Sequence, residues 1–350
     1  MSFFGSFSFL RIKFQRVLRY LDVAEAIRPK ILLIENVPQM LNHGFDGRLG
    51  KLSETVIDML EKDLGYNVKV AIVNCADYGV PQLRERAVFI ATSVGTASLP
   101  MPTHADPLDV NALGTGRMPW VTVEEAIRDL PTPPLLNDSL GGTDLKNYNE
   151  MDQTDFMRVM RTSNTFPYNH ITRSYRESVL NIIREMRPGL TWVAESARMR
   201  EAYATTIELF ARELKISGAI AKKRLEQSGA INPVFYKNYY WSAYSRLAWD
   251  KPALTITANA NFLGSGQFTH PTQDRGITMR EAAQLQSFDD DFRFITSDND
   301  KCDTKRIGIG MDMIGEAVPP LLAGALANHL ADQLDQRGRP VISKATAQAI

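Results

Sequence analysis

The stretch ILLIENV, from Ile31 to Val37, indicates the fold class of this 350-residue chain. Four aliphatic residues stand in a row between a Pro-Lys pair and the polar pair Glu35 and Asn36. A short apolar run with these boundaries is typical of a strand that is covered on both faces, as in a parallel sheet. We therefore expect residues 31–37 to be a strand of such a sheet.

The elements around this strand alternate between helix and strand. Residues 15–28 have helical periodicity, with Val17, Leu18, Leu21 and Ala24 on one face. The pattern further predicts a helix over residues 52–62, strands over 68–73 and 87–92, and later helices over 175–187, 197–227 and 320–334. Strand, helix and strand at this spacing indicate an open α/β sheet.

Composition bounds the class of protein. With 44% hydrophobic and 23% charged residues the chain can bury a core, and its net charge of zero means that any nucleic-acid surface must be local. Residues 151–250 hold 15 Lys/Arg against 10 Asp/Glu, a modest excess that a solvated surface ordinarily explains. No apolar run approaches the roughly 20 residues of a membrane helix. The N-terminus places aromatic residues before basic ones, the reverse of a signal peptide. We predict a cytoplasmic protein with no membrane span.

Four stretches, taken in order, resemble one family. ENVPQM begins at Glu35, NCADYGVPQLRERAVFIAT at Asn74, HPTQDRGITMREAAQLQSF at His270 and IGEAVPPLLAGALA at Ile314. They resemble blocks VI, VIII, IX and X of the bacterial cytosine-C5 DNA methyltransferase family, over roughly residues 14–335. One E-N-V alone is a weak signal, but four blocks in order are specific. The resemblance implies an α/β fold: the C-terminal part of a Rossmann-like sheet of S-adenosylmethionine-dependent methyltransferases, with a smaller target-recognition domain.

The resemblance also implies domains, a reaction and partners. Residues 1–100 would form a partial catalytic domain, 101–250 the connecting and target-recognition region, 251–335 the return to the catalytic domain and 336–350 a tail. The implied reaction moves a methyl group from S-adenosylmethionine to C5 of cytosine in double-stranded DNA. Such an enzyme would work in the cytoplasm, associated with the nucleoid.

The chemistry of that reaction explains the residue types. In this family a thiolate adds to C6 of a flipped-out cytosine, and negative charge then develops on the ring near N3 and O2. By resemblance Glu35 hydrogen-bonds or protonates N3. Arg86 would contact O2 and stabilise the charge there, while Arg84 would brace the nucleophile loop.

The resemblance gives supporting roles to further residues. Asn36 and Val37 would shape the loop after the strand, and Gln82 would support the turn before the two arginines. Cofactor contacts would come from Glu316, Ala317 and Val318. No metal site is implied.

Without the resemblance, each residue has a plainer explanation. Glu35 would be a solvated strand end, and one arginine of an isolated R-x-R would lie at the surface. His170 and His270 are expected to hydrogen-bond in loops or core rather than to hold a metal. The aromatic cluster VFYKNYYW, residues 234–241, favours core packing over stacking on DNA.

The sequence departs from the family pattern at the nucleophile. The family's catalytic cysteine lies in a Pro-Cys loop before the E-N-V block, and no cysteine precedes Glu35 here. Cys75 stands where the family has a small residue, so we expect a buried packing residue. Cys302 lies between the last two blocks and is not expected to be the nucleophile. The glycine-rich cofactor block is also absent, which puts binding of S-adenosylmethionine by this chain alone in question.

Three smaller departures lie in the later blocks. Glu316 replaces the usual asparagine, Gln284 the usual arginine and Asp289 the usual proline. They suggest relaxed selection or a variant geometry, and the sequence does not distinguish the two.

These departures predict an incomplete chain. The strand at residues 31–37 would become an apolar edge strand, and the helix at 320–334 would lose the surface it packs against. We therefore expect a poorly soluble or partly molten chain that a second polypeptide with the missing blocks rescues. The alternatives are a truncated or misannotated reading frame, a catalytically dead DNA-binding relative and a structural remnant with neither activity.

Overall fold

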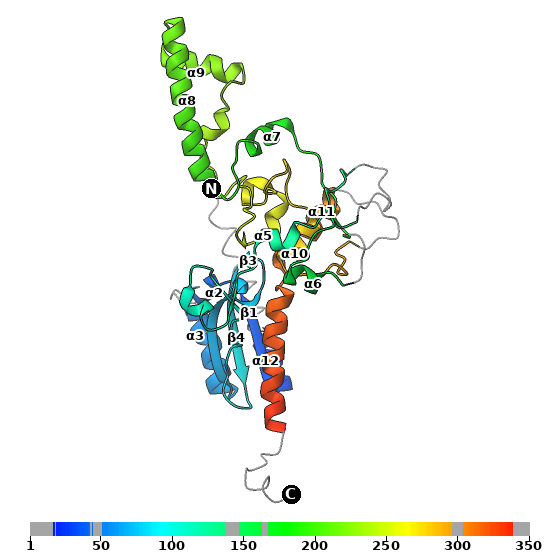
Figure 1. Cartoon of the computed structure of the whole chain (residues 1–350). Helices are drawn as coiled ribbons and strands as arrows, with labels where there is room; N and C mark the ends of the chain where they lie inside the picture. The colour runs from blue at the N-terminus through cyan, green and yellow to red at the C-terminus, as the bar shows by residue number, and fades with distance from the viewer. Residues whose placement is uncertain are drawn as a thin grey trace, which may run out of the picture. The chain divides into compact units, whose positions relative to one another are not determined.

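The structure is a computed structural model that describes residues 17, 19–42, 44, 51–136, 147–162, 167–295 and 304–338 (Figure 1). The chain forms two compact units. The first unit holds residues 1–78, 84–118 and 320–350, and the second holds residues 79–83 and 119–319. Each unit is therefore built from segments that lie far apart in the sequence.

The first unit is built on a three-stranded sheet. Its strands are β1 (Ile31–Asn36), β4 (Glu85–Thr92) and β2 (Asn67–Asn74), in the order β1-β4-β2. The central strand β4 runs antiparallel to both neighbours, so β1 and β2 run in the same direction. The helices α2 (Gln39–Asn42) and α3 (Lys51–Asp58) and the π-helix η1 (Met59–Asp63) connect β1 to β2. The predicted α/β class is confirmed.

One face of the sheet carries the core of this unit. Residues 19–27 are helical, and Leu21 and Ala24 of the predicted apolar face are buried. They pack with Leu32 of β1, Phe89 of β4 and buried residues of α2, α3 and η1. The alternation of side chains along each strand sends one set of residues into this core and the next set to the opposite face.

The prediction that residues 31–37 are covered on both faces is wrong. Leu33 of β1 is 37% exposed, and the strand pairs antiparallel with β4 rather than with a parallel partner. The strand that is buried on both faces is β4, where every residue after Glu85 is buried. The reason is position: β4 lies between two strands, whereas β1 lies at the edge of the described sheet.

The second unit is mainly helical. Its longest helix, α8 (Trp192–Leu214), packs beside α9 (Gly218–Gln227) at one end of the unit (Figure 1). The Trp192 ring stacks on Phe235 with 5.3 Å between ring centroids, which anchors the base of α8. A short parallel pair, β3 (Gln82–Leu83) with β7 (Ala253–Leu254), lies in the same unit.

The remaining elements are short, apart from the helices α11 and α12. They are η2 (Cys75–Tyr78), β5 (His104–Ala105), α4 (Val110–Leu113), β6 (Met118–Pro119), α5 (Val123–Ile127), α6 (Asp155–Met160), α7 (Glu177–Ile183), η3 (Pro233–Tyr236), η4 (Ala258–Asn261), η5 (Leu263–Ser265), α10 (Met279–Leu285), α11 (Thr304–Glu316) and α12 (Pro320–Gly338). The helix α11 packs closely on η4, because a Cβ atom on Gly315 would lie 2.2 Å from the backbone nitrogen of Ala258.

The helix α12 returns to the first unit. Leu322, Leu326 and Leu330 are buried along one side, so the expectation that this helix lacks a packing surface is wrong for the described residues. His329 contacts the backbone oxygen of Ser98 through Nε2 at 3.0 Å. By length and composition alone, the run Thr304–Leu334 could cross a membrane. It is divided between α11, which ends at Glu316, and α12, which begins at Pro320, and its buried residues belong to the two units.

Candidate active site

Glu35 and Arg86 form an ion pair in the first unit. Oε1 of Glu35 lies 2.5 Å from Nε of Arg86, and Nη1 of Arg86 also donates to the backbone oxygen of Glu85 at 2.7 Å. The two side chains are largely shielded from water, where an ion pair is stronger than at an open surface. The pair presents a hydrogen-bond acceptor beside a donor at the end of a strand.

The register of the sheet brings the two residues together. Glu35 lies opposite Val88, and Val88 is two residues along β4 from Arg86. Residues two apart on a strand point to the same face, so Arg86 and Val88 share the face of Glu35. Val73 of β2 lies opposite Arg86 and completes this row.

Cys75 lies beside these groups but is buried. It begins η2, directly after β2, and its backbone N–H donates to the backbone oxygen of Arg84 at 2.9 Å. Burial raises the pKa of the Cys75 thiol to about 12, and the opposing influence of Arg86 and Arg84 does not offset it. The thiol is therefore protonated at neutral pH, whereas a nucleophile needs the thiolate. The predicted burial of Cys75 is confirmed.

Arg84 and Arg86 are both buried, with 1% and 8% exposure. The plainer expectation for an isolated R-x-R, that one arginine lies at the surface, is therefore wrong. Burial lowers the pKa of Arg84 to about 10, and the neighbouring charge of Arg86 adds to the effect. The Arg84 guanidinium therefore still carries its charge at neutral pH. The Glu35 carboxylate pairs with Arg86, and the Arg84 guanidinium lies near both side chains.

Asn74 fixes the backbone at Arg84, a role that the sequence analysis did not predict. Its Oδ1 accepts hydrogen bonds from the backbone N–H groups of Ala76 and Arg84, both at 3.2 Å. An asparagine at the end of a strand, followed by a turn, is the sequence signal for such a side-chain bond. Asn74 thereby fastens the end of β2 to the segment that leads into β4.

Asn36 and Val37 follow Glu35 at the end of β1. Oδ1 of Asn36 accepts from the backbone N–H of Val37 at 2.8 Å, which turns the chain out of the strand. Val37 is exposed. These contacts match a loop-shaping role, and a catalytic contribution of either residue remains a prediction.

Gln82 belongs to the second unit and is fully buried. Its Nε2 donates to Oε1 of Gln286 at 2.5 Å and to the backbone oxygen of Leu285 at 3.1 Å, while its Oε1 accepts from the backbone N–H of Ile256 at 2.9 Å. One side chain therefore ties together β3, the segment after β7 and the end of α10.

Gln286 extends this network toward the predicted cofactor segment. Its Nε2 donates to the backbone oxygens of Ile314 at 2.9 Å and Ala317 at 3.1 Å. Glu316 is exposed at the end of α11, and Val318 is half-buried. Gln286 was not singled out from the sequence, because nothing in a glutamine beside a helix end reveals which distant carbonyls it will meet.

The aromatic cluster at residues 234–241 divides into two parts. Phe235 is fully buried against Trp192, which confirms core packing for that residue. Tyr240 and Trp241 are instead exposed, at 58% and 45%. Their rings lie 5.8 Å apart at 52° to each other.

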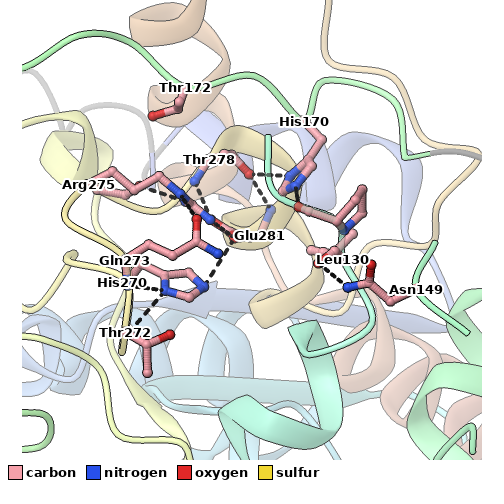
Figure 2. Close-up of polar contacts among 12 residues, drawn as sticks. Leu130, Asn149, His170, Thr172, His270, Thr272, Gln273, Arg275, Thr278 and Glu281 are labelled. Atoms are coloured by element: carbon pink, nitrogen blue, oxygen red, sulfur yellow. Dashed lines mark hydrogen bonds and ion pairs between the residues drawn. The ribbon is translucent and has the colours of Figure 1, made fainter. Parts of the chain in front are cut away.

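Two histidines meet around Glu281 in the second unit (Figure 2). His170 bridges the hydroxyl of Thr278 at 2.9 Å and the backbone oxygen of Pro131 at 2.6 Å. Nδ1 of His270 accepts from the backbone N–H groups of residues 272 and 273 at 3.2 and 3.0 Å, so its proton is on Nε2. Both histidines are therefore buried hydrogen-bonding residues, as predicted.

Arg275 and Glu281 form a buried pair with two bonds of 2.7 Å each. Burial alone would raise the pKa of the Glu281 carboxyl, but the Arg275 guanidinium outweighs it and holds the pKa well below its usual range. Glu281 also accepts from the backbone N–H of Thr278 at 2.6 Å, as part of a capping box that starts α10. This network fixes the helix that carries Gln284 and leads to Gln286.

Gln284, where the family usually has arginine, lies beside another arginine. Arg161 donates to Asp129 from Nε at 2.8 Å and from Nη2 at 2.5 Å, and the Gln284 amide oxygen accepts from the same guanidinium. A second guanidinium here would repel the first, so glutamine fits. Asp289, where proline is usual, accepts from the backbone N–H of Phe292 at 3.0 Å and so caps its own turn.

A solved prophage-encoded DNA modification methyltransferase (E. coli) superposes with a TM-score of 0.60 at 18% identity, covering 92% of this chain and 74% of that one. This likeness shows the fold.

The chain belongs to the family of C-5 cytosine-specific DNA methylases, which it matches over residues 15–332. Two relatives illustrate the match. A protein of Oceanobacillus iheyensis named as a type II methyltransferase is 28% identical over 89% of this chain and 70% of its own length. The type II methylase M.HgiDII of Herpetosiphon aurantiacus is 28% identical over 91% of this chain and 69% of its own length. The family's methyl donor is S-adenosylmethionine.

Proposed function

We propose that this chain supplies the target-cytosine pocket of a DNA (cytosine-5-)-methyltransferase, with S-adenosylmethionine as methyl donor and double-stranded DNA as substrate. The Glu35–Arg86 ion pair, at 2.5 Å, carries the proposal. Such an enzyme acts where its DNA is, in the cytoplasm and at the nucleoid.

The proposed chemistry uses each charged group at one atom of the base. A thiolate adds to C6 of the flipped-out cytosine and leaves negative charge on the ring. When the base binds, the Glu35 carboxylate would give up its ion pair with Arg86, take up a proton and donate a hydrogen bond to N3, and the Arg86 guanidinium would then stabilise charge at O2. Arg84 adds a second fixed cation, which requires no rearrangement as the charge forms. C5 would then take the methyl group from the sulfonium of the donor, which leaves as the neutral thioether. Loss of the C5 proton to a base and cleavage of the C6–S bond would restore the ring and release the thiolate.

The thiolate is proposed to come from a second polypeptide. Cys75 is buried with its pKa raised to about 12, and Cys302 lies outside the described residues. The edge strand β1 has an open side in the described sheet. Next to it, Tyr20, Val23 and Ile27 expose one apolar side of the helix at residues 19–27. An unpaired strand edge beside exposed apolar side chains is a surface that another chain would cover.

The donor's position is proposed to include Glu316. S-adenosylmethionine carries positive charge at its sulfonium and amino groups, and the exposed Glu316 carboxylate fits a positive group. The backbone groups of Ala317 already make hydrogen bonds within the protein: its N–H donates to the oxygen of Ile314, and its oxygen accepts from Gln286. Ala317 is therefore expected to contact the donor mainly by packing.

The test is methyl transfer from labelled S-adenosylmethionine to duplex DNA. The purified chain alone should transfer no label. Mixing it with a polypeptide that carries the Pro-Cys loop and the glycine-rich block expected of the family should restore transfer, and Glu35→Gln should abolish it again. Transfer by the chain alone would overturn the two-chain proposal.

A second candidate function is DNA binding without methylation. The raised pKa of Cys75 favours it, because no described thiol is activated. A salt-sensitive gel shift, with no methyl transfer under any pairing, would support this alternative.

A further inference from the structure

A cavity in the second unit lies outside the groups that the proposed mechanism uses. Its volume is about 560 Å³, within the range of small-molecule sites. The residues that line it are Leu83, Tyr240, Trp241, Ser242, Leu254, Thr255, Thr257, Asn259, Ser265, Gly266, Gln267 and Phe268. All of them belong to the second unit, so the cavity is complete within one compact part of the chain.

The lining of this cavity carries no charged side chain. Its polar side chains are the hydroxyls of Ser242, Thr255, Thr257 and Ser265 and the amides of Asn259 and Gln267. The hydroxyls of Thr255 and Ser265 already donate to backbone oxygens, of Leu83 and of Asn259 and Phe262 respectively, and so offer acceptors. Amides both donate and accept, and this mixture suits the edge of a neutral heterocycle. A phosphate, or the charged sulfonium and amino acid of S-adenosylmethionine, would lie here without a compensating charge.

Two exposed aromatic rings stand at this cavity. Tyr240 and Trp241 both line it, and neither is packed into the core as Phe235 is. Tyr239, the residue before them, instead packs edge-on against Trp192 with 5.1 Å between centroids. Tyr239 is itself partly exposed, at 37%, but its ring packs on Trp192, whereas Tyr240 and Trp241 are more exposed. Open aromatic faces stack on nucleobases.

The inner part of the cavity is shaped by Gly266 and Phe268. Phe268 is buried, and a Cβ atom on Gly266 would lie 2.5 Å from its ring. The backbone at Gly266 therefore passes directly against the aromatic ring. An alanine there would have to displace that ring, which offers a way to alter the cavity without touching its mouth.

We propose that this cavity receives one unstacked nucleobase of the bound DNA, other than the cytosine that is methylated. The inference rests on the proposed function, since it takes DNA to be the substrate. The methylated base needs a carboxyl and a guanidinium group, which the cavity lacks. A base that leaves the stack beside the target would place its face on Trp241 or Tyr240 and its edge on the hydroxyls and amides.

The experiment compares two 20-base-pair duplexes, one fully paired and one with a single unpaired thymine, by fluorescence anisotropy with the full chain. The wild-type chain should bind the bulged duplex roughly tenfold more tightly, the size of one base–aromatic stack. Trp241→Ala and Tyr240→Ala should reduce this preference, and Trp241→Phe should keep it. Phe262→Ala is the matched control, because Phe262 is exposed but does not line the cavity.

A 2-aminopurine at the bulge supplies a second readout. The fluorescence of 2-aminopurine should be quenched on binding, and the quenching should be weaker with Trp241→Ala. Gly266→Ala, which alters the cavity, should also change the extent of this quenching. Equal affinity for both duplexes, or a preference that survives loss of both rings, would overturn the inference. So would full displacement of the bulged base by S-adenosylmethionine, which would mark the cavity as the donor's site. If the paired duplex binds and only the preference fails, the proposed function stands; if neither duplex binds, both fail.

Discussion

Glu35 and Arg86 lie 51 positions apart in the sequence and meet at 2.5 Å, on neighbouring antiparallel strands. Glu35 is one residue from the end of the pairing between β1 and β4, and Arg86 is one residue from the end of the pairing between β2 and β4. Both therefore lie where the sheet stops. The end of a sheet gives a charged group rigid support and an open side for a ligand. A pair placed there is available for chemistry in a way that the same pair in the middle of β4 would not be.

We expect the Glu35–Arg86 pair to contribute to stability as well as to the proposed reaction. A double-mutant cycle of Glu35→Ala and Arg86→Ala should give a coupling free energy of about 1–3 kcal/mol, since the pair is largely shielded from water. Urea unfolding measures it. The exposed pair Arg19–Asp22, at 3.3 Å, is the matched control and should give a coupling near zero. Equal couplings would contradict a buried pair.

Cys75 is expected to be unreactive in the folded protein. Burial raises its pKa to about 12, so at pH 8 only about one thiol in ten thousand is ionised. Iodoacetamide at pH 8 should leave Cys75 unmodified in the native chain and modify it in urea, as peptide mass spectrometry would show. Cys75→Ser should leave methyl transfer intact in the two-chain assay. Rapid labelling of native Cys75 would argue for a nucleophile instead.

Gln286→Ala should destabilise the second unit. The substitution leaves the backbone oxygens of Ile314 and Ala317 without the side chain that bonds them, and removes a partner of Gln82. Buried polar groups that lose a bond cost about 1–3 kcal/mol each, so the free energy of unfolding should fall by about 2–4 kcal/mol. Gln227→Ala, at the exposed end of α9, is the control and should change stability by less than about 0.5 kcal/mol. A neutral Gln286→Ala would mean that water or a relaxed backbone replaces these bonds.

Acid should destabilise the protein through His170 and His270. Burial lowers the pKa of each to about 4, from an ordinary value of 6.5. Between pH 6.5 and 4 the unfolded chain binds protons that the folded chain does not, so stability falls as the pH falls through this window and is constant above it. Glu281, held ionised by Arg275, adds no opposing effect.

The measurement is the free energy of unfolding in urea at pH 7.5, 6, 5 and 4.5. Each histidine should contribute a slope of up to about 1.4 kcal/mol per pH unit within the window. His270→Gln keeps an acceptor for the backbone N–H groups at residues 272 and 273 and should lower the slope. A slope that is unchanged in His270→Gln would locate the acid sensitivity elsewhere.

The sequence alone indicated most of the secondary structure. Apolar periodicity located the helices at α3, α8, α9 and α12 and the strands β1, β2 and β4, because burial of one face leaves a period that is visible in the letters. It did not indicate that β4 would separate β1 from β2. Strand order depends on which chain segments meet, and a run of aliphatic residues reads the same at the edge of a sheet as in its middle.

The candidate site divides in the same way. The order of the sequence blocks identified Glu35, Arg84 and Arg86 as candidate site residues. The burial of both arginines and of Cys75 depends on the packing around them, which the sequence did not show. Asn74 and Gln286 escaped notice because their partners are backbone groups, which no sequence letter marks. Likewise, the reason for a glutamine at position 284 is its hydrogen bond with Arg161, which also pairs with Asp129, and only the folded structure shows these contacts.

The sequence by itself determined the family, the α/β class and the charged residues of the pocket, because these follow from local residue types and their order. The tertiary structure decided which of those residues meet, which thiol is protonated and which aromatic rings stay open at a cavity. The physical reason is that pKa values, ion pairs and exposed faces depend on the distance and burial of groups far apart in the chain, and only the folded packing sets both.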